Sequence, residues 1–236
     1  IDLAEIVLKW EKKAQQIRNA HLAESVNGAA IQESANVAYE IPPNQKEIFV
    51  TYLIRYVNFS GQRATEVEIL QRTVRILQET LQFKEWADVD IKLPLFDKFL
   101  ITVDFSTISS IVYTLNSLEM FCIVLESRDS EWILSNLSYL KKLIETCLKC
   151  DSYEVHKNIQ TITDIVLKVI YDEIDDDPEK KTEEIKEFIK TLVSVSGECL
   201  SSASNAKLAS GVIACASMAQ YEPMLVDHLL NLILKS

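Results

Sequence analysis

The sequence has little glycine and little proline, with four Gly and five Pro among 236 residues. Average proteins contain about 7% glycine and about 5% proline. These two residues supply the backbone conformations of tight turns, so their scarcity argues against architectures built on tight β-turns. A hydrophobic content of 48% and a charged content of 25% are ample for a packed core. The composition therefore predicts an all-α protein.

Long apolar runs and a surplus of basic residues are missing as well. No stretch of about 18 consecutive apolar residues occurs, so we expect no segment that spans a membrane. The formal net charge is −11, whereas nucleic-acid binding depends on clustered Lys and Arg, so we expect no direct contact with nucleic acid. No signal peptide is visible, and the start at Ile1 and the end at Ser236 indicate a segment of a longer polypeptide.

Cysteine and histidine provide no strong reactive site. Five cysteines, an odd number without the spacing of a disulfide framework, are typical of reduced thiols in the cytosol or nucleus. Cys147 and Cys150 form a C-x-x-C with His156 six residues later, but a zinc site needs four ligands and no second pair follows. We interpret the pair as two thiols near a junction between helices, with a metal or redox role as the alternative. The other histidines, His21 and His228, are scattered.

The motifs of common enzyme classes are also absent. The chain contains no G-x-S-x-G, Walker loop, G-x-G-x-x-G or H-E-x-x-H. The sequence therefore predicts no catalytic, cofactor-binding or metal-binding residue and no enzymatic activity. The acidic run from Asp172 to Glu179 lacks the central Gly of a calcium loop, because Pro178 and Lys180-Lys181 occupy that region. We interpret it as a solvated loop, with a docking patch for a basic partner as the alternative.

Apolar residues follow a helical period almost throughout. The clearest predicted helix carries one apolar face, formed by Val67, Leu70, Val74, Leu77 and Leu81. A second stripe near the start of the chain is also predicted to face inward, and its members are Leu3, Ile6, Val7, Trp10, Ala14 and Ile17. Burial is expected for Trp10 and Trp132. Trp86 is interpreted either as an exposed partner anchor or as a link between adjacent repeats.

Three breaks interrupt one continuous helical segment, residues 1–236. Residues 21–46 are small and polar and end in two prolines, which predicts a long, partly mobile loop. Residues 85–95 are predicted to be an extended connector between repeats, and residues 172–178 an acidic loop. Eight or nine helices with short turns imply antiparallel pairs, whose lengths suit HEAT-like units of about 40–47 residues. The predicted fold is a HEAT-like α-solenoid that belongs to a longer superhelix, and an irregular helical bundle is the alternative.

One stretch, Glu85–Phe105 (EWADVDIKLPLFDKFLITVDF), is less generic than the helices around it. It resembles a segment that joins two helical repeats in the TRRAP family, the very large transformation/transcription domain-associated pseudokinases. The shared features are a Trp, a Lys-Leu, a Phe-Asp-Lys and a Thr-Val. Asp2–Glu11 and Asn44–Tyr56 resemble the same family, and the likeness fades after Asp172. The resemblance identifies no individual functional residue.

The resemblance implies a role in transcription. Members of the family resemble kinases of the phosphatidylinositol 3-kinase-related class without their catalytic residues, and they are nuclear subunits of SAGA-type and NuA/TIP-type histone acetyltransferase complexes. The chain would then be a non-catalytic scaffold segment of the HEAT-repeat solenoid, outside the kinase-like domain and without a cofactor. It would support recruitment by transcriptional activators.

Charge favours an architectural role over direct activator binding, because activation domains are commonly acidic and this chain is acidic too. The alternative function is a HEAT-repeat adaptor or scaffold of another class. Such a protein would be an active kinase solenoid or an importin-like transport factor.

Overall fold

The computed structural model describes the backbone of residues 1–26, 40–60, 67–91, 108–177, 182–227, 229–230 and 234. The helices are α1 (Asp2–Val26), α2 (Pro43–Ser60), α3 (Val67–Leu81), α4 (Lys84–Ala87), α6 (Ile108–Glu126), α7 (Ser130–Ser135), α8 (Leu137–Leu148), α9 (His156–Asp176), α10 (Glu183–Leu200), α11 (Asn205–Tyr221) and the 3-10 turn η4 (Pro223–Leu225). No strand occurs within these ranges, and the all-α prediction is confirmed. Among the described residues, no helix combines the length and the apolar character that crossing a membrane requires.

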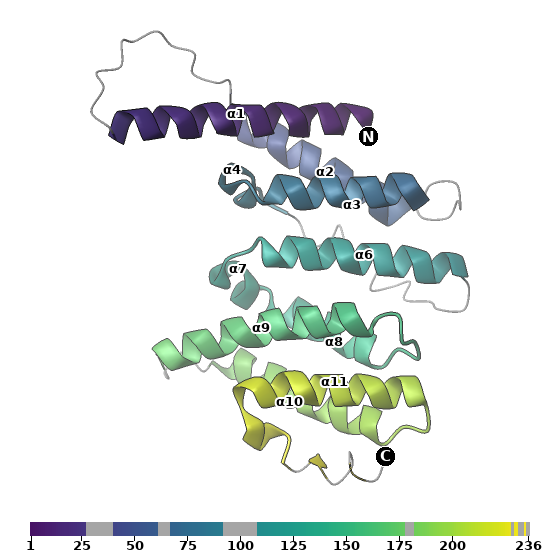
Figure 1. The fold of residues 1–236 in the computed structure, drawn as a ribbon. Coiled ribbons are helices and arrows are strands. Elements are labelled where there is room, and N and C mark those ends of the chain that lie inside the picture. Colours follow the sequence, from purple (N-terminus) through teal and green to yellow (C-terminus); the bar gives the residue numbers. More distant parts are fainter. Residues whose placement is uncertain are drawn as a thin grey trace.

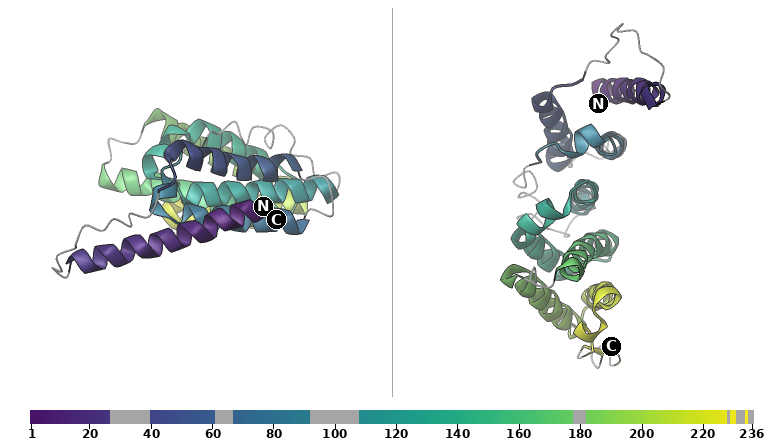
Figure 2. Two further views of the ribbon diagram at one scale, coloured as in Figure 1. Left: turned by 90° about the horizontal axis from the view of Figure 1, so that it is seen from above. Right: turned by 90° about the vertical axis from the view of Figure 1, so that its left-hand side faces the viewer.

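The helices stack in two layers (Figure 1). In one layer α3, α6, α9 and α11 follow one another, while α2, α8 and α10 form the second layer beside them, as Figure 2 shows from the side. Neighbours in the chain pack as pairs, for example α2 with α3 and α10 with α11, and α6 packs on both α3 and α9. Such a stack of helix pairs is an α-solenoid, as the helix lengths and turn spacing predict.

The apolar face predicted for α3 is buried in the structure. Its described members are Leu70, Val74, Leu77 and Leu81. Thr73 and Thr80 are buried on the same helix, and their hydroxyls donate to the carbonyls of Ile69 and Ile76 at 2.7 and 2.6 Å. These local bonds satisfy the two hydroxyls, so the threonines are buried without leaving polar groups unpaired.

Side-chain caps fix where three of the helices begin. The side chains of Asp129, Thr182 and Ser204 each accept a hydrogen bond from a backbone N–H in the first turn of α7, α10 and α11. Each cap satisfies one of the donors that a helix N-terminus leaves unpaired. For α7 the capping residue is Asp129, whose side chain accepts from the backbone N–H of Trp132 at 2.8 Å.

The inward face predicted for α1 is wrong for Leu3, Ile6 and Trp10, whereas Ala14 is buried as predicted. Leu3 is 73% exposed and Ile6 is 61% exposed, and Trp10 is exposed as well. The buried face of α1 is rotated by about a quarter of a turn from the predicted stripe and consists of Ala4, Leu8, Glu11 and Ala14. Apolar residues extend around more than one face of this helix, so periodicity alone could not fix which face is buried. Polar contacts with α3 and α4 select the face that contains Glu11.

The predicted loop at residues 21–46 is helical at both ends. α1 continues to Val26 because residues 21–26 include good helix formers and neither Gly nor Pro. α2 begins at Pro43, since the fixed φ of proline and its missing N–H suit the first helical position. Residues 27–39 lie outside the described residues.

The predicted extended connector at residues 85–95 begins with a helical turn instead. α4 starts at Lys84, and Trp86 lies in the middle of this turn. The bulky Trp86 side chain is fully buried, which fixes the short helix against α2. The rest of the predicted connector after Ile91, including the expected extended Lys92–Pro94, lies outside the described residues.

The acidic segment at residues 172–178 is mostly the end of a helix rather than a loop. α9 continues to Asp176, and Asp177 is its C-cap. Ile170 is buried and Ile174 packs partly buried against the core one turn later. The apolar stripe of α9 therefore extends through the acidic run and keeps it helical. Pro178 lies outside the described residues.

Candidate functional site

A lysine buried between helices joins α2 to α4. Lys46 is only 3% exposed, and its Nζ donates to Glu40 Oε1 at 3.0 Å and to the carbonyl of Glu85 at 3.1 Å. The same Nζ lies 5.8 Å from the centroid of the Trp86 ring, within the range of a cation–π contact. Phe49 of α2 meets this ring edge-on, with centroids 5.4 Å apart. Trp86 is thus a link between helices, and the reading of it as an exposed anchor is wrong.

A second buried charge ties α1 to α4. Glu11 is 2% exposed and pairs with Arg18 on the same helix, and the Arg18 Nε lies 3.8 Å from Glu85 Oε1. Gln15 also donates to Glu85. Burial alone would raise the pKa of Glu85, but its own backbone N–H, the Gln15 bond and the positive charges of Arg18 and Lys46 together lower that pKa.

We call the residues of these two sets the polar cross-link: Glu11, Gln15, Arg18, Glu40, Lys46, Glu85 and Trp86. It connects three helices from separate parts of the chain. Every charged group in it faces an opposite charge or a hydrogen-bond partner, as buried charges must. Its chemistry is that of a structural fastening.

The five cysteines have buried or half-buried thiols. Cys147 is buried and Cys150 is half-buried, and all five thiols are free. Burial raises the pKa of Cys147 far above its ordinary value and that of Cys150 to about 11, so neither forms a thiolate readily. Among the described residues, no group of three or more His, Cys, Asp and Glu side chains could hold a metal ion.

His156 meets a partner that the sequence did not reveal. Its Nε2 lies 2.9 Å from the Ser210 hydroxyl and 3.1 Å from the carbonyl of Ala206, both on α11. A serine nucleophile must reach a substrate, whereas Ser210 is only 1% exposed and also bonds the carbonyl of Ala206. Burial lowers the pKa of His156, which keeps it neutral in this joint. The pair fastens the start of α9 to α11. His21 and His228 lie outside the residues with described side chains.

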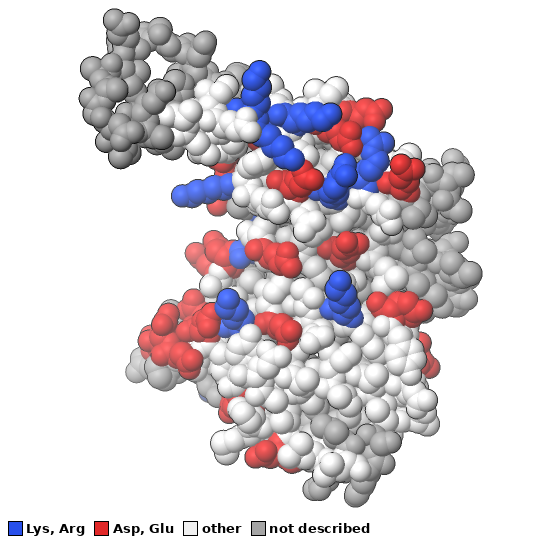
Figure 3. Space-filling view, viewed as in Figure 1, with Lys and Arg blue, Asp and Glu red and all other residues white. Residues whose placement is uncertain are grey.

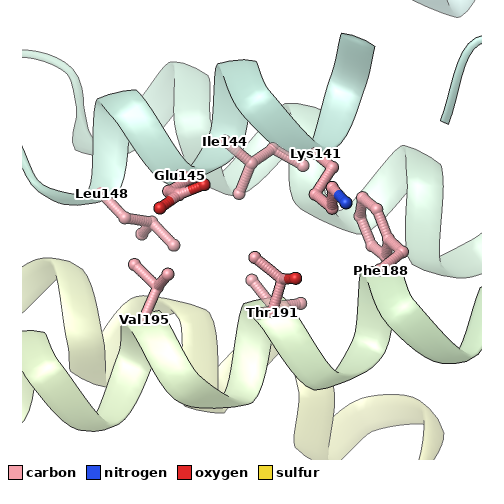
Figure 4. Close-up of a pocket in the computed structure, with 8 residues that line it drawn as sticks. Lys141, Ile144, Glu145, Leu148, Phe188, Thr191 and Val195 are labelled. Atoms are coloured by element: carbon pink, nitrogen blue, oxygen red, sulfur yellow. The ribbon is translucent and has the colours of Figure 1, made fainter. Parts of the chain in front are cut away.

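A small cavity between α8 and α10 is part of the packing. Figure 4 shows Lys141, Ile144 and Leu148 of one helix facing Phe188 and Val195 of the other. Its volume is about 10 Å³, close to the least that holds one water molecule. This interface therefore holds repeats together and has no room for a substrate.

A larger groove of about 450 Å³ lies where α7, α8, α9 and α10 meet. Leu134, Leu137 and Ile185 form an apolar floor, and Glu131, Glu173 and Glu184 add carboxylates around it. We call these six residues the glutamate groove. They come from four helices spread over more than fifty positions, so no local sequence pattern could have identified them.

The exposed side of α1 presents a second candidate surface. Leu3, Ile6 and Trp10 follow one another at helical spacing on the side away from the buried face, and we call them the α1 ridge. On α2, Ile48 and Tyr52 are also exposed, one turn apart. Exposed apolar groups gathered in this way are typical of surfaces that bind another protein element.

Comparison with known proteins identifies the relatives of this chain. The family model of the Tra1 HEAT repeat ring region matches residues 1–236. The chain is 31% identical over 189 residues to the SAGA complex/NuA4 acetyltransferase complex subunit TRA1 of Saccharomyces cerevisiae. This match covers 72% of the chain and 5% of the yeast protein. It is 24% identical over 209 residues to the transformation/transcription domain-associated protein of Danio rerio, with 69% of this chain and 5% of that protein covered.

A third relative, the SAGA complex/NuA4 acetyltransferase complex subunit Tra1 of Schizosaccharomyces pombe, is 21% identical over 205 residues, with 87% of this chain and 5% of that protein covered. The chain thus spans about 5% of the length of the curated relatives it matches. No solved structure matches it significantly.

Proposed function

This chain belongs to the Tra1 HEAT repeat ring family, and on that premise we propose that it is a non-catalytic scaffold segment of a SAGA- or NuA4-type acetyltransferase complex subunit. Its relatives in Saccharomyces cerevisiae and Schizosaccharomyces pombe are named as subunits of such complexes. Family membership favours this role over that of an importin-like transport factor. The nucleus is the corresponding location.

The α1 ridge is the observation that carries the scaffold role. α3 and α11 each pack beside a helix of the second layer, α2 and α10 respectively. α1 packs on α3, and its ridge of Leu3, Ile6 and Trp10 faces away from the core. Helices of a solenoid bury their apolar faces only against neighbours, so one more helix packed on this ridge would extend the two-layer stack.

The contacts between repeats support a mechanical rather than a chemical role. The polar cross-link fastens α1, α2 and α4, and His156 with Ser210 fastens α9 to α11. Fastened repeats transmit the position of one end of the stack to the other. Recruitment by activators would then depend on the shape of the whole superhelix. As a separate part of the proposal, the kinase-like region of the parent protein is inactive.

Purification of the parent protein from cells tests this function. We expect mass spectrometry of the co-purifying proteins to find acetyltransferase-complex subunits and the preparation to acetylate histones. Transport factors among the companions, or kinase activity that an active-site inhibitor abolishes, would point to a scaffold of another class.

A further inference from the structure

The glutamate groove has a rigid apolar floor. Leu137 and Ile185 are almost completely buried in the core, while Leu134 is half-buried at the edge. Because Leu137 and Ile185 are anchored in the core, the floor keeps its shape when the groove is empty. Its volume of about 450 Å³ falls within the range of about 300–1,000 Å³ typical of binding clefts. The groove can therefore accept a bulky side chain.

Carboxylates from three helices surround this floor. Glu131 and Glu184 are exposed on α7 and α10, and Glu173 lies on α9. Lys186 pairs with Glu183 and Lys141 pairs with Glu187, both at 2.6 Å. The described lining of the groove carries three carboxylates and no Lys or Arg, so its charge is negative. A concave site with charge of one sign attracts ligands of the other sign.

The end of α9 strengthens this negative potential at a cost in stability. Asp172, Asp175 and Asp176 are exposed in its last turns, which carry no basic residue. The C-terminus of a helix carries partial negative charge, so carboxylates there are unfavourable. Figure 3 shows acidic side chains gathered at this end of α9. Residues that violate local rules of helix stability commonly mark functional sites.

We propose that the glutamate groove binds a basic peptide segment of a partner protein, with one bulky aliphatic side chain flanked by Lys or Arg. The aliphatic side chain packs on Leu134, Leu137 and Ile185. The flanking cations pair with Glu131 and Glu184, and Arg suits these carboxylates better than Lys because it binds them in a bidentate manner. Nucleic acid does not fit, because its phosphates are repelled by the same carboxylates. This site is independent of the proposed scaffold function.

Fluorescence anisotropy with defined peptides tests the proposal on the 236-residue chain. The probe is a short fluorescein-labelled peptide with one Leu between Lys-Arg pairs, and the comparison peptide carries Ser in place of Leu. We expect the Leu peptide to bind with a Kd below about 1 mM and the Ser peptide to bind at least about fivefold more weakly. Equal binding of the two peptides would show that the apolar floor is not used.

Two double variants distinguish peptide binding in the groove from general electrostatic attraction of the peptide to an acidic surface. The double substitution Glu131→Gln/Glu184→Gln removes two exposed rim charges without touching the core, and we expect it to weaken binding at least about tenfold. Glu68→Gln/Glu119→Gln removes two exposed charges from α3 and α6 and should leave binding within about twofold. Equal losses in both variants would overturn the proposal, as would undetectable binding of the Leu peptide. Tighter binding of a single-stranded oligonucleotide than of the peptide would overturn it too.

Discussion

The two ends of the stack are held together in different ways. α1 lies on α3 through ion pairs: Arg72 Nη2 is 3.0 Å from both Asp2 and Glu5, and Lys12 pairs with Glu79. α10 and α11 instead meet through close packing, with the α-carbon of Gly211 against Leu200 and the carbonyl of Ser196. The first contact adds exposed ion pairs to the buried side chains of Ala4 and Leu8, whereas the second depends on shape.

The composition of the chain shows the same contrast. Residues 1–87 contain ten Lys and Arg against eleven Asp and Glu, whereas residues 88–236 contain fourteen against twenty-four. Balanced charges can pair across helices, while surplus carboxylates stay on the surface. Ion pairs also join helices in the second part, for example Lys141 of α8 with Glu187 of α10, but there the carboxylates outnumber the cations.

Removal of a large core side chain from the shape-dependent part should have the largest effect. Phe188 is buried between α8 and α10, so Phe188→Ala leaves a cavity and should lower the free energy of unfolding by about 3–5 kcal/mol. Leu3→Ala, on the exposed α1 ridge, should change it by less than about 1 kcal/mol, because Leu3 is 73% exposed. Urea unfolding followed by circular dichroism measures both, and similar losses would erase the distinction.

Two glycines provide a finer test of the packing between α10 and α11. A Cβ at Gly211 would lie 3.0 Å from Leu200 Cγ, Leu200 N and Ser196 O, so Gly211→Ala should destabilise the fold by about 1–3 kcal/mol. At Gly197 the nearest atom, Leu229 Cδ2, is 3.4 Å away, and Gly197→Ala should be neutral or stabilise by up to about 1 kcal/mol. Thermal unfolding of the two variants gives the comparison. A neutral Gly211→Ala would mean that the helices are less closely packed than described.

Salt should loosen α1 and leave α10 and α11 unchanged. An increase in ionic strength from about 0.1 M to about 1 M shortens the Debye length from about 10 Å to about 3 Å. The exposed pairs between α1 and α3 weaken, so hydrogen exchange of α1 amides should accelerate by about two- to tenfold. Mass spectrometry of the exchanged peptides resolves the helices. Equal acceleration in α11 would show that both ends depend on charge.

Acid should act on the polar cross-link with a smaller effect. The folded-state pKa of Glu85 is lowered from the ordinary value of 4.5, so its stabilising contribution is complete above that value and is lost as the pH falls through the lower folded pKa. We therefore expect the contacts of α1 with α4 to weaken below about pH 4.5. Hydrogen exchange of α1 between pH 3 and pH 5 checks this, after correction for intrinsic rates. Glu85→Gln should remove most of this pH dependence, and an unchanged dependence would assign it to other carboxylates.

Sequence periodicity predicts buried faces well where one side of a helix is clearly apolar. α3 is such a helix, and its face from Leu70 to Leu81 is buried as predicted. α1 is not, because its apolar residues spread around the helix from Leu3 and Ile6 to Ala4 and Leu8. The buried face also contains Glu11, a residue type that is seldom fully buried. Arg18, two turns away on the same side of α1, was the available signal for a buried ion pair.

The acidic run shows a second limit. The sequence indicates a break at residues 172–178 because acidic residues and proline favour loops, yet Ile174 keeps the apolar stripe of α9 in register to Asp176. The alternative reading of that run, a docking patch for a basic partner, stays a prediction. The glutamate groove depends on how α7, α8, α9 and α10 meet, which is a property of tertiary packing and of no single segment.

The scaffold role depends most directly on the α1 ridge. In the full-length parent protein, Leu3→Glu/Ile6→Glu places two charges on the ridge, while Gln16→Glu/Asn19→Asp places two on exposed positions of the same helix outside it. The decisive measurement is the amount of acetyltransferase subunits that co-purify with each variant. We predict a loss of at least about fivefold for the ridge variant and near-normal recovery for the control. Normal recovery with the ridge variant would contradict the claim that this surface packs another element of the assembly.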